Sequence, residues 1–201
     1  MDQKAMNSIS YGLYVLTATN GNFSNGCIIN TLTQVTSSPN RVSITVNKSN
    51  YTCYMIRQSG KFNVSFIDET ADFSLFKHFG FSTGRWEDKF YRFTSIRAEN
   101  GIPYVPEHTN AYLSGKVVKE IDLGTHIMFI ADVEDAKELS DKPSMTYAYY
   151  HKNVKPKPKA KNDGKVRYIC TICGYIYEGE LPPDFICPIC KHGVADFKRM
   201  D

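Results

Sequence analysis

Four cysteines near the C-terminus are the residues whose spacing points most directly to chemistry. They form two Cys-x-x-Cys pairs, Cys170 with Cys173 and Cys187 with Cys190, in a chain of 201 residues. Each pair lets two sulfur atoms from one tight turn face a single ion, and two such turns complete a tetrahedron. We therefore expect these four thiolates to bind one metal ion.

Two disulfide bonds are the alternative use of four cysteines, and they need an oxidising compartment. The opening residues, MDQKAMNSISYGL, contain no apolar core of signal-peptide length. No run anywhere approaches the roughly 18 apolar residues of a membrane span. We therefore expect a cytoplasmic protein with no membrane association, in which the thiols stay reduced.

The type of metal has to be inferred from the flanking residues, because four thiolates bind either iron or zinc. Gly174 follows the first pair and can take a left-handed backbone that turns amides toward sulfur at no steric cost. Five aromatic side chains could wall the site from water: Tyr168, Tyr175, Tyr177, Phe185 and Phe197. A dry, amide-rich shell suits a one-electron iron site, so these residues favour iron, and zinc stays the alternative.

Residues 166–199 resemble rubredoxin, an electron carrier with one iron held by four cysteines. The resemblance lies in YICTICGYIYEG, in LPPDFICPIC and in the closing DF. Two features differ from that family: only 13 residues separate Cys173 from Cys187, and Lys191 stands where glycine is usual. Neither difference changes a ligand, so the resemblance implies one iron in the four-cysteine site.

The charge distribution divides the chain into three parts. The net charge of +3 comes from residues 155–165, KPKPKAKNDGK, which carry +4, while residues 1–154 are neutral and residues 166–201 carry −1. Alternating Lys and Pro favours an extended, solvated spacer. We therefore expect two domains, 1–154 and 166–201, joined by a linker, and no nucleic-acid-binding face.

The first domain is predicted to be mainly β. Alternating apolar residues or turn-bounded apolar runs predict strands at residues 11–19, 26–36, 41–46, 62–67, 111–118 and 126–133. Helices are expected from Ser49 or Asn50 to Gly60 and at residues 71–79. Mostly antiparallel strands with few helices favour a closed β-barrel. Cys27 and Cys53 stand alone in this domain and are expected to be small buried side chains.

A polar stretch in the first domain could bind an anion. Residues 24–52 are rich in hydroxyl and amide side chains and end at Lys48, Ser49, Asn50 and Thr52, on the first turn of the expected helix. Free amides and a cation at a helix N-terminus favour a phosphate. The alternative is that Ser49 or Asn50 only caps the helix. No Rossmann or P-loop motif is present.

Residues 7–152 resemble the flavin reductase-like, FMN-binding split barrels. The resemblance lies in INTLTQVTSSPNRVSITVNKSNYT, SGKFNVSFI, DKF, NGIPYV and GTHIMFIADV. By position it implies that Asn30, Thr31, Leu32 and Thr33 lie along the flavin ring, and that Asn47, Lys48, Ser49 and Thr52 receive its phosphate. Lys89 is a lesser phosphate candidate, and His126 matches a catalytic position. A histidine satisfied by hydrogen bonds at a strand end is the alternative for His126.

Together the two resemblances match the architecture of the high-molecular-weight rubredoxins. That family is understood to oxidise NADH and to supply electrons to flavodiiron proteins, which reduce oxygen or nitric oxide. The resemblance implies FMN as the hydride acceptor, NAD(P)H as the donor, iron as the one-electron carrier and a flavodiiron protein as partner. It also implies a homodimer with flavin at the interface, to which Phe79, Phe81 and Trp86 could contribute. The alternative is that these aromatic side chains belong to the core of the first domain.

Two other functions fit the same residues. One is a reductase of free flavin or ferric complexes, with an accessory iron domain. The other is a zinc-ribbon interaction module on a β-barrel, in which the lysines of the linker contact nucleic acid. Visible colour in the purified protein separates this last alternative from the two flavin- and iron-based ones.

Overall fold

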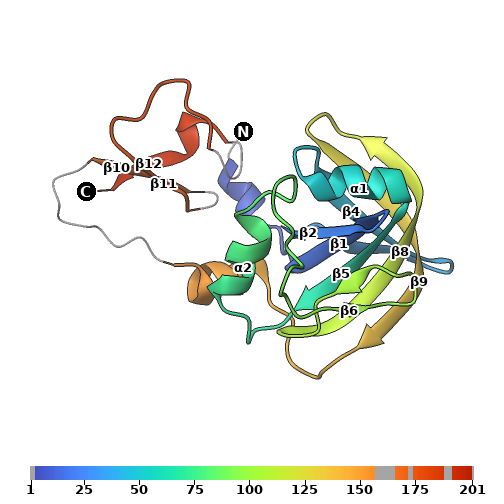
Figure 1. The fold of residues 1–201 in the computed structure, drawn as a ribbon. Helices are drawn as coiled ribbons and strands as arrows, with labels where there is room; N and C mark the ends of the chain where they lie inside the picture. The colour runs from blue at the N-terminus through green and yellow to red at the C-terminus, as the bar shows by residue number, and fades with distance from the viewer. Residues whose placement is uncertain (1–2, 157–165, 172–173, 188–191, 201) are drawn as a thin grey trace. The chain divides into compact units, whose positions relative to one another are not determined.

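The chain folds into two compact units, Met1–Val154 and Lys155–Asp201. The computed structural model describes residues 3–156, 166–171, 174–187 and 192–200 (Figure 1). The division falls where the first domain was expected to end, and most of the expected linker, residues 157–165, lies outside the described residues. No helix in the described ranges is long and apolar enough to cross a membrane.

The first unit is built on one seven-stranded antiparallel sheet with strand order β2-β1-β5-β8-β9-β4-β3. Its strands are β1 Tyr14–Asn20, β2 Phe23–Ile29, β3 Thr33–Ser37, β4 Asn40–Asn47, β5 Lys61–Ile67, β8 Thr109–Asp122 and β9 His126–Glu138. A small hairpin pairs β6 Ile96–Arg97 with β7 Pro103–Tyr104. The helical segments are Gln3–Ser8, α1 Tyr51–Ser59, α2 Phe73–Gly80, α3 Tyr147–Tyr149 and Tyr150–Val154. The expected β8–β9 hairpin and both expected helices are confirmed.

The sheet is open between β2 and β3, two strands that follow one another in the sequence. β2 and β3 form its opposite edges, yet only residues 30–32 join them. The sheet must therefore curl until its edges almost meet, which gives a barrel with an open seam. The expectation of one continuous strand over residues 26–36 is wrong, because the chain leaves β2 after Ile29 and crosses the seam before it starts β3.

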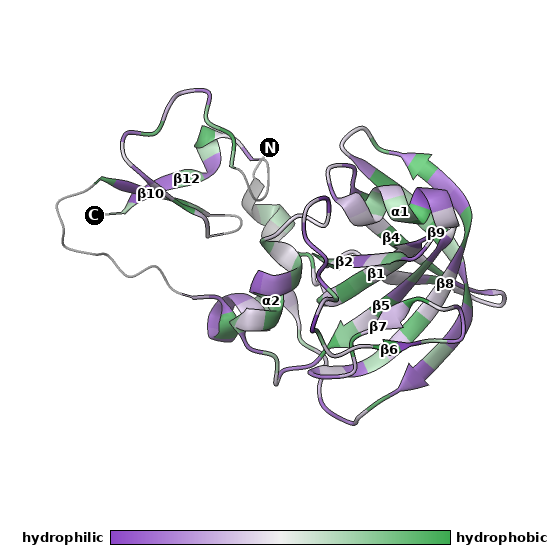
Figure 2. Cartoon of the chain, viewed as in Figure 1, coloured by the Kyte–Doolittle hydropathy of each residue, from purple (hydrophilic) through white to green (hydrophobic). Residues whose placement is uncertain are grey.

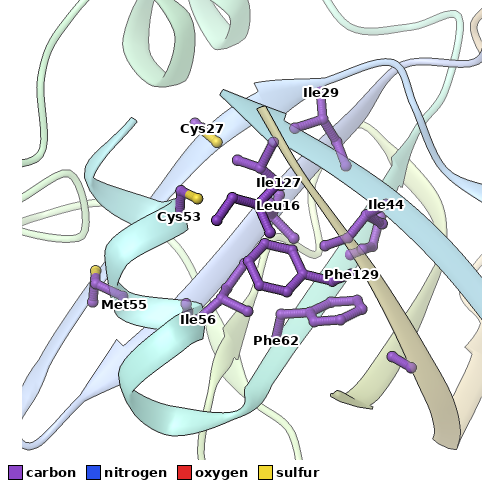
Figure 3. Close-up of a cluster of buried hydrophobic side chains, with 14 of the residues drawn as sticks. Leu16, Cys27, Ile29, Ile44, Cys53, Met55, Ile56, Phe62, Ile127 and Phe129 are labelled. Atoms are coloured by element: carbon purple, nitrogen blue, oxygen red, sulfur yellow. The ribbon is translucent and has the colours of Figure 1, made fainter. Parts of the chain in front are cut away.

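The barrel interior is apolar because strand residues alternate between its two faces. On β4, Val42, Ile44 and Val46 are buried, while the residues between them are half exposed. Helix α1 covers one side of this core and buries Met55 and Ile56. Figure 3 shows Ile56 directed from the helix toward Phe129. The same alternation is visible as green and purple bands along the strands in Figure 2. The interior is therefore filled by side chains, and any ligand site must lie at the seam, on the outer face or at the turns that end the strands.

One glycine is needed for this packing. Gly115 of β8 lies opposite Phe62 of β5, and a Cβ added at Gly115 would come within 2.5 Å of the Phe62 ring. That distance is far below van der Waals contact, so any larger residue forces the ring or the strand to move. The ring of Phe62 can lie flat across the sheet because Gly115 has no side chain.

The second unit is a three-stranded antiparallel sheet in the order β11-β10-β12. Its strands are β10 Arg167–Cys170, β11 Ile176–Glu178 and β12 Phe197–Met200, with a short 3-10 turn at Val194–Asp196. Cys170, Cys187 and Phe197 are buried together in its small core. A core of this size stabilises little by itself, which is typical of domains that depend on a bound metal.

Candidate functional site

A cavity of about 260 Å³ lies at the open seam of the barrel. All four residues predicted to follow the flavin ring, Asn30, Thr31, Leu32 and Thr33, line it. The wall is completed by Ser43 and Thr45 of β4, Met128 of β9 and residues 9–12 before β1. The structure therefore brings the predicted ring-binding residues together around one hollow.

The seam offers backbone groups that the sheet leaves unused. Among the residues that the structure describes, no backbone–backbone hydrogen bond involves Asn30, Thr31 or Leu32. The segment is held instead by the Thr31 hydroxyl, which donates to the Thr45 carbonyl at 2.6 Å and accepts from the Thr45 amide at 3.2 Å. Amides and carbonyls beside a half-exposed hollow that make no backbone hydrogen bond are available to water or to a polar ligand. The edge of a flat heterocycle such as the flavin ring supplies such partners.

The outer face of β4 and β9 continues from this cavity to the other predicted residues. Thr45 lies opposite Met128 in the ladder, and Asn47 lies opposite His126. All four side chains are half exposed, because alternate residues of a strand point to the same face. From Ser43 to Asn47 this row spans roughly 13 Å at 3.3 Å per residue. The row suits an elongated molecule with a ring at one end and a phosphate at the other.

Helix α1 begins directly after this row, and its N-terminus has no side-chain cap. Asn50 occupies the cap position, but its side chain makes no capping hydrogen bond. The amides of Tyr51 and Thr52 have no acceptor within the helix, as in the first turn of any helix. The capping alternative considered for Asn50 is therefore wrong, and these donors are available to an anion.

Lys48, beside this helix start, is already paired. Its ammonium lies 2.6 Å and 2.7 Å from the two carboxylate oxygens of Asp122. The pKa of Asp122 is lowered, first by this hydrogen bond from Lys48 and then by the amide of Gly124. A phosphate arriving at the helix would share Lys48 with this carboxylate, which the sequence pattern did not reveal.

Ser49 and Thr52 each present one group at the helix start that has no partner among the described residues. The Ser49 amide donates to the Asn47 side chain at 2.8 Å. The Thr52 side chain is buried and contacts the thiol of Cys27. The free groups that these residues present at the helix start are therefore the Ser49 hydroxyl and the Thr52 amide.

His126 starts strand β9 and is held by its neighbour. The Thr125 hydroxyl lies 2.8 Å from Nδ1 of His126. The Thr125 carbonyl accepts from the Lys48 amide at 3.0 Å, which ties this turn to the loop before α1. In the part of the chain that the structure describes, Nε2 of His126 has no hydrogen-bond partner. The predicted catalytic histidine therefore adjoins the predicted phosphate loop with one ring nitrogen available.

Lys89 does not join these residues. Its side chain is only 2% exposed, and its ammonium donates to the carbonyls of Gly26 at 2.9 Å and Phe79 at 2.8 Å. Burial lowers the pKa of this lysine. Its geometry fastens the loop after α2 to strand β2, so we withdraw Lys89 from the phosphate-binding candidates. Phe79, expected at a dimer interface, is likewise in the core at 1% exposure.

Some residues near the site carry no sequence pattern that would have identified them. Residues 9–12 and Met128 enter the cavity wall only because the chain folds back on the seam. Arg85, from the loop after α2, has its guanidinium carbon 5.6 Å from the centre of the Tyr51 ring, at the first residue of α1. Only the tertiary fold brings Arg85 to this helix.

The two cysteines of the barrel interior behave as expected. Cys27 and Cys53 are buried, and burial raises the pKa of both thiols, that of Cys53 to about 11. Thiols with raised pKa values are poor nucleophiles at neutral pH. Figure 3 shows both sulfurs among the apolar side chains of the core.

The second unit holds half of the predicted metal ligands within the described residues. Cys170 and Cys187 are fully buried, and the aromatic side chains expected around the metal pack beside them: Tyr168, Tyr175, Tyr177, Phe185 and Phe197. Gly174 has the expected left-handed backbone, with φ of +82°. Its amide donates to the Cys170 carbonyl at 2.8 Å. Cys173, Cys190 and Lys191 lie outside the described residues. Two buried sulfurs inside an aromatic shell fit the thiolate donor set that iron or zinc requires.

Comparison with known families gives one match for each unit. Residues 6–157 match the family described as Flavin reductase like domain. Residues 168–198 match the family described as Rubrerythrin, rubredoxin-like domain. The two matches together cover both compact units.

The chain is also similar to characterised proteins and solved structures. It is 35% identical to a high molecular weight rubredoxin of Moorella thermoacetica, over the full length of both chains. It is 37% identical to a ferric-chelate reductase (NAD(P)H) of Archaeoglobus fulgidus, over 75% of this chain and 89% of that one. A diflavin flavoprotein of Nostoc is 27% identical over 76% of this chain but only 26% of its own length. Among solved structures, the NADH:FAD oxidoreductase SgcE6 of Streptomyces globisporus superimposes with a TM-score of 0.65 at 22% identity, over 72% of this chain and 85% of that one.

Proposed function

This chain belongs to the flavin reductase-like family, and from that premise we propose that it moves electrons from NAD(P)H through a bound FMN and a rubredoxin-type iron to a protein acceptor. At the coarser level it is an NAD(P)H-dependent, flavin reductase-like oxidoreductase with a rubredoxin-like domain. The finer steps below concern which residues take part and where the electrons go.

The observation that carries the proposal is the continuous polar row along the seam. It runs from the cavity at Asn30 to Thr33, past Thr45, to Asn47 and the uncapped start of α1. Unpaired amides lie at one end and helix amides lie at the other. This order of groups matches a flavin mononucleotide, whose ring needs hydrogen-bond partners and whose phosphate needs positive potential.

The residues of this row would divide the work of binding. Asn30, Thr31, Leu32 and Thr33 would hydrogen-bond the ring, with Thr31 keeping the segment in place through Thr45. The side chains of Asn47, Lys48 and Ser49, with the amide of Thr52, would hold the phosphate. His126, fixed through Nδ1 by Thr125, would present Nε2 to the nicotinamide substrate and orient it.

The two cofactors supply the redox chemistry. Bound flavin accepts a hydride as two electrons and can release them singly, whereas a four-thiolate iron changes by one electron. Covalent fusion keeps donor and acceptor at a high effective concentration. Cys170, Cys173, Cys187 and Cys190 would hold the iron, and the aromatic shell would keep water from the sulfurs.

A flavodiiron-type protein is the acceptor that we propose. The barrel unit of this chain is similar to a part, 26% of the length, of a protein named as a diflavin flavoprotein, and this similarity supports an acceptor of that type. In this chain the rubredoxin-like unit would take the electrons to a separate protein. The reaction is proposed to take place in the cytoplasm.

An anaerobic stopped-flow experiment tests the route with the full-length chain. In the wild type, NADH should bleach the flavin absorbance near 450 nm and then the ferric iron bands, and electrons should reach an added flavodiiron protein. Cys170→Ser should leave flavin reduction unchanged and stop delivery to the acceptor. Equal delivery by both proteins would reject the proposed route through iron while leaving the flavin site intact.

A homodimer is proposed as the assembled form. Among the aromatic residues of the loop after α2, Trp86 is 89% exposed and Phe81 is partly exposed. Exposed aromatic side chains are enriched at protein interfaces. Analytical ultracentrifugation should give a dimer that Trp86→Ser weakens, and a monomer with flavin fully bound would contradict the dimer.

Direct reduction of ferric chelates is a second candidate function. It is favoured by the 37% identity to a protein named as a ferric-chelate reductase, which aligns with the barrel-sized portion of this chain. Steady-state turnover with a ferric chelate separates the two functions. If the Cys170→Ser variant matches the wild type with the chelate, and the wild type is slow with protein acceptors, the chelate is the substrate.

A further inference from the structure

A second, larger cavity of about 480 Å³ lies at the other end of strand β2. Three turns converge on it: Gly21 with Asn22 before β2, Ser59 with Lys61 at the end of α1, and Asn100 to Ile102 in the β6–β7 hairpin. The seven residues of β2 separate Asn22 from Asn30 of the seam cavity. At 3.3 Å per residue this is on the order of 25 Å, so the two cavities are distinct.

Two cations and no carboxylate line this second cavity. Lys61 and Arg97 both contribute to its wall, whereas no Asp or Glu does so. One guanidinium nitrogen of Arg97, Nη1, donates to the Gly101 carbonyl at 2.6 Å. Over the ranges that the structure describes, neither the Lys61 ammonium nor the other Arg97 nitrogens have a hydrogen-bond or ion-pair partner. These donors therefore face a hollow without a counter-charge.

The strand pairing adds a third positive charge nearby. Lys61 lies directly opposite Lys116 in the β5–β8 ladder. Like charges directly opposite each other destabilise a sheet. Lys116 also lies opposite Asp132 of β9, which offsets part of its charge, so an anion in the cavity would relieve the part of the repulsion that falls on Lys61.

The remaining lining indicates what the anion carries. Among the polar side chains of the wall, Asn22 makes no hydrogen bond within the described residues, whereas Thr19, Ser59 and Asn100 already have protein partners. Ile102 is the only large apolar side chain along the described wall. No aromatic ring lines the cavity, so a nucleobase would have nothing to stack against. The volume exceeds what a lone phosphate ion needs and falls in the range of small-molecule sites. A compact ligand with several hydroxyl groups fits this lining best.

Two glycines leave the backbone open to such a ligand. Gly21 and Gly101 have φ of +59° and +79°, and a Cβ added at either would meet no atom within 4 Å. The cavity wall at both turns is therefore bare backbone, which a ligand can approach closely.

We propose that this cavity binds the phosphate group of a small hydroxyl-rich phosphate ester, of the sugar phosphate or polyol phosphate class. Arg97, steered by its bond to Gly101, makes charge-assisted hydrogen bonds to two phosphate oxygens. Lys61 adds a second positive charge. The Asn22 side chain and the bare backbone at Gly21 and Gly101 bind the hydroxyl groups. The site lies apart from the proposed flavin site and does not depend on it.

Isothermal titration calorimetry on the full-length holoprotein tests the site with three probes: ribose 5-phosphate, inorganic phosphate and ribose. Saturating FMN is present throughout, so that the phosphate loop at Lys48 is closed to the probes. Ribose 5-phosphate should bind most tightly, inorganic phosphate less tightly, and ribose not measurably. Raising NaCl from 50 mM to 500 mM should weaken binding, because screening reduces the attraction.

Matched variants locate the binding. Lys61→Gln and Arg97→Gln should each lower the affinity for ribose 5-phosphate about tenfold, since a charge-assisted hydrogen bond contributes on that scale. Lys119→Gln, an exposed lysine of β8 outside the cavity wall, should change nothing. Equal melting temperatures and flavin content show that the variants are folded. Absence of binding at millimolar probe, or weakening by Lys48→Gln but not by Lys61→Gln, overturns the proposal. Such a result would leave the proposed electron route untouched, because that route is measured with NADH and an acceptor.

Discussion

The two units of this protein carry their chemistry in opposite ways. In the rubredoxin-like unit, the proposed function is concentrated in four predicted metal ligands, of which Cys170 and Cys187 are fully buried in a small aromatic core. In the barrel, the proposed flavin site is distributed over a seam segment, an outer strand face and a helix start, and no single side chain dominates it. A metal site needs particular atoms at fixed distances, whereas a large organic cofactor can be held by many weak contacts.

This difference has a consequence for single substitutions. Loss of one ligand should abolish the iron site, because a structural metal stabilises its domain only when coordination is complete. Loss of one seam contact should only reduce flavin affinity. The predictions below test this contrast, from the largest expected effect to the smallest.

The largest effect is expected for Cys187→Ser. Because Cys187 is fully buried and is a predicted ligand, the variant should lose the iron absorbance bands completely and show no bound iron by elemental analysis. The barrel should keep its flavin at wild-type affinity. Retention of iron in this variant would show that the second unit keeps its cofactor after loss of one contact, as is expected of the barrel.

Thr31→Val is expected to lower the affinity for FMN about tenfold. The substitution keeps the side-chain volume but removes both hydrogen bonds to Thr45, so the seam segment is no longer held for the ring. Each such bond contributes roughly 0.5–1.5 kcal/mol, and FMN should dissociate about tenfold more readily. Fluorescence titration measures this change in FMN affinity. The affinity for riboflavin should fall by the same factor, because the substitution affects the contacts to the ring and not those to the phosphate.

A smaller effect of opposite sign is expected for Asp122→Asn. The carboxylate now competes for the Lys48 ammonium, so removing its charge should tighten FMN about two- to fivefold, in line with the modest strength of exposed ion pairs. Riboflavin lacks the phosphate and should bind as before. The gain should shrink at 1 M salt. An equal gain in affinity for FMN and riboflavin would show that Asp122 acts on binding of the flavin ring and not of the phosphate.

The smallest effect is expected for Asp135→Asn, which should change the titration of Tyr112 and leave flavin affinity unchanged. The Tyr112 hydroxyl donates to Asp135 at 2.7 Å, and this hydrogen bond raises the pKa of Tyr112 to about 12. Folding thus favours the neutral phenol, so its contribution to stability is complete below pH 10 and is lost as pH rises toward 12. Absorbance at 295 nm should show Tyr112 titrating lower in Asp135→Asn. Unchanged flavin affinity in that variant would show that the effect stays local.

The same contrast explains what the sequence could predict. The cysteines and Gly174 were identifiable because a metal site and a left-handed turn restrict residue type directly. The β8–β9 hairpin and α1 followed from periodicity and turn residues. The break between β2 and β3 was missed because residues 30–32 keep an alternating, strand-like pattern, and only closure of the barrel pulls them out of the sheet.

Lysines were the least predictable residues. Lys48, Lys61 and Lys89 have the same side chain, yet one is paired with a carboxylate, one faces a cavity and one is buried against carbonyls. Which of these occurs depends on residues distant in sequence. The type of a cationic residue therefore indicates little about its role until its partners are known.

The position of the proposed cofactor face in the sheet has a consequence for folding kinetics. The β8–β9 hairpin is closed by three residues, whereas the β4–β9 ladder joins Asn47 to His126, 79 positions away. Contacts between distant residues form late, because their loop-closure entropy must be overcome first. We therefore expect the hairpin to be structured in the folding transition state and the β4–β9 face to be completed after it. Interactions absent from the transition state act on the unfolding rate. A flavin bound to this face should then slow unfolding and leave the refolding rate nearly unchanged.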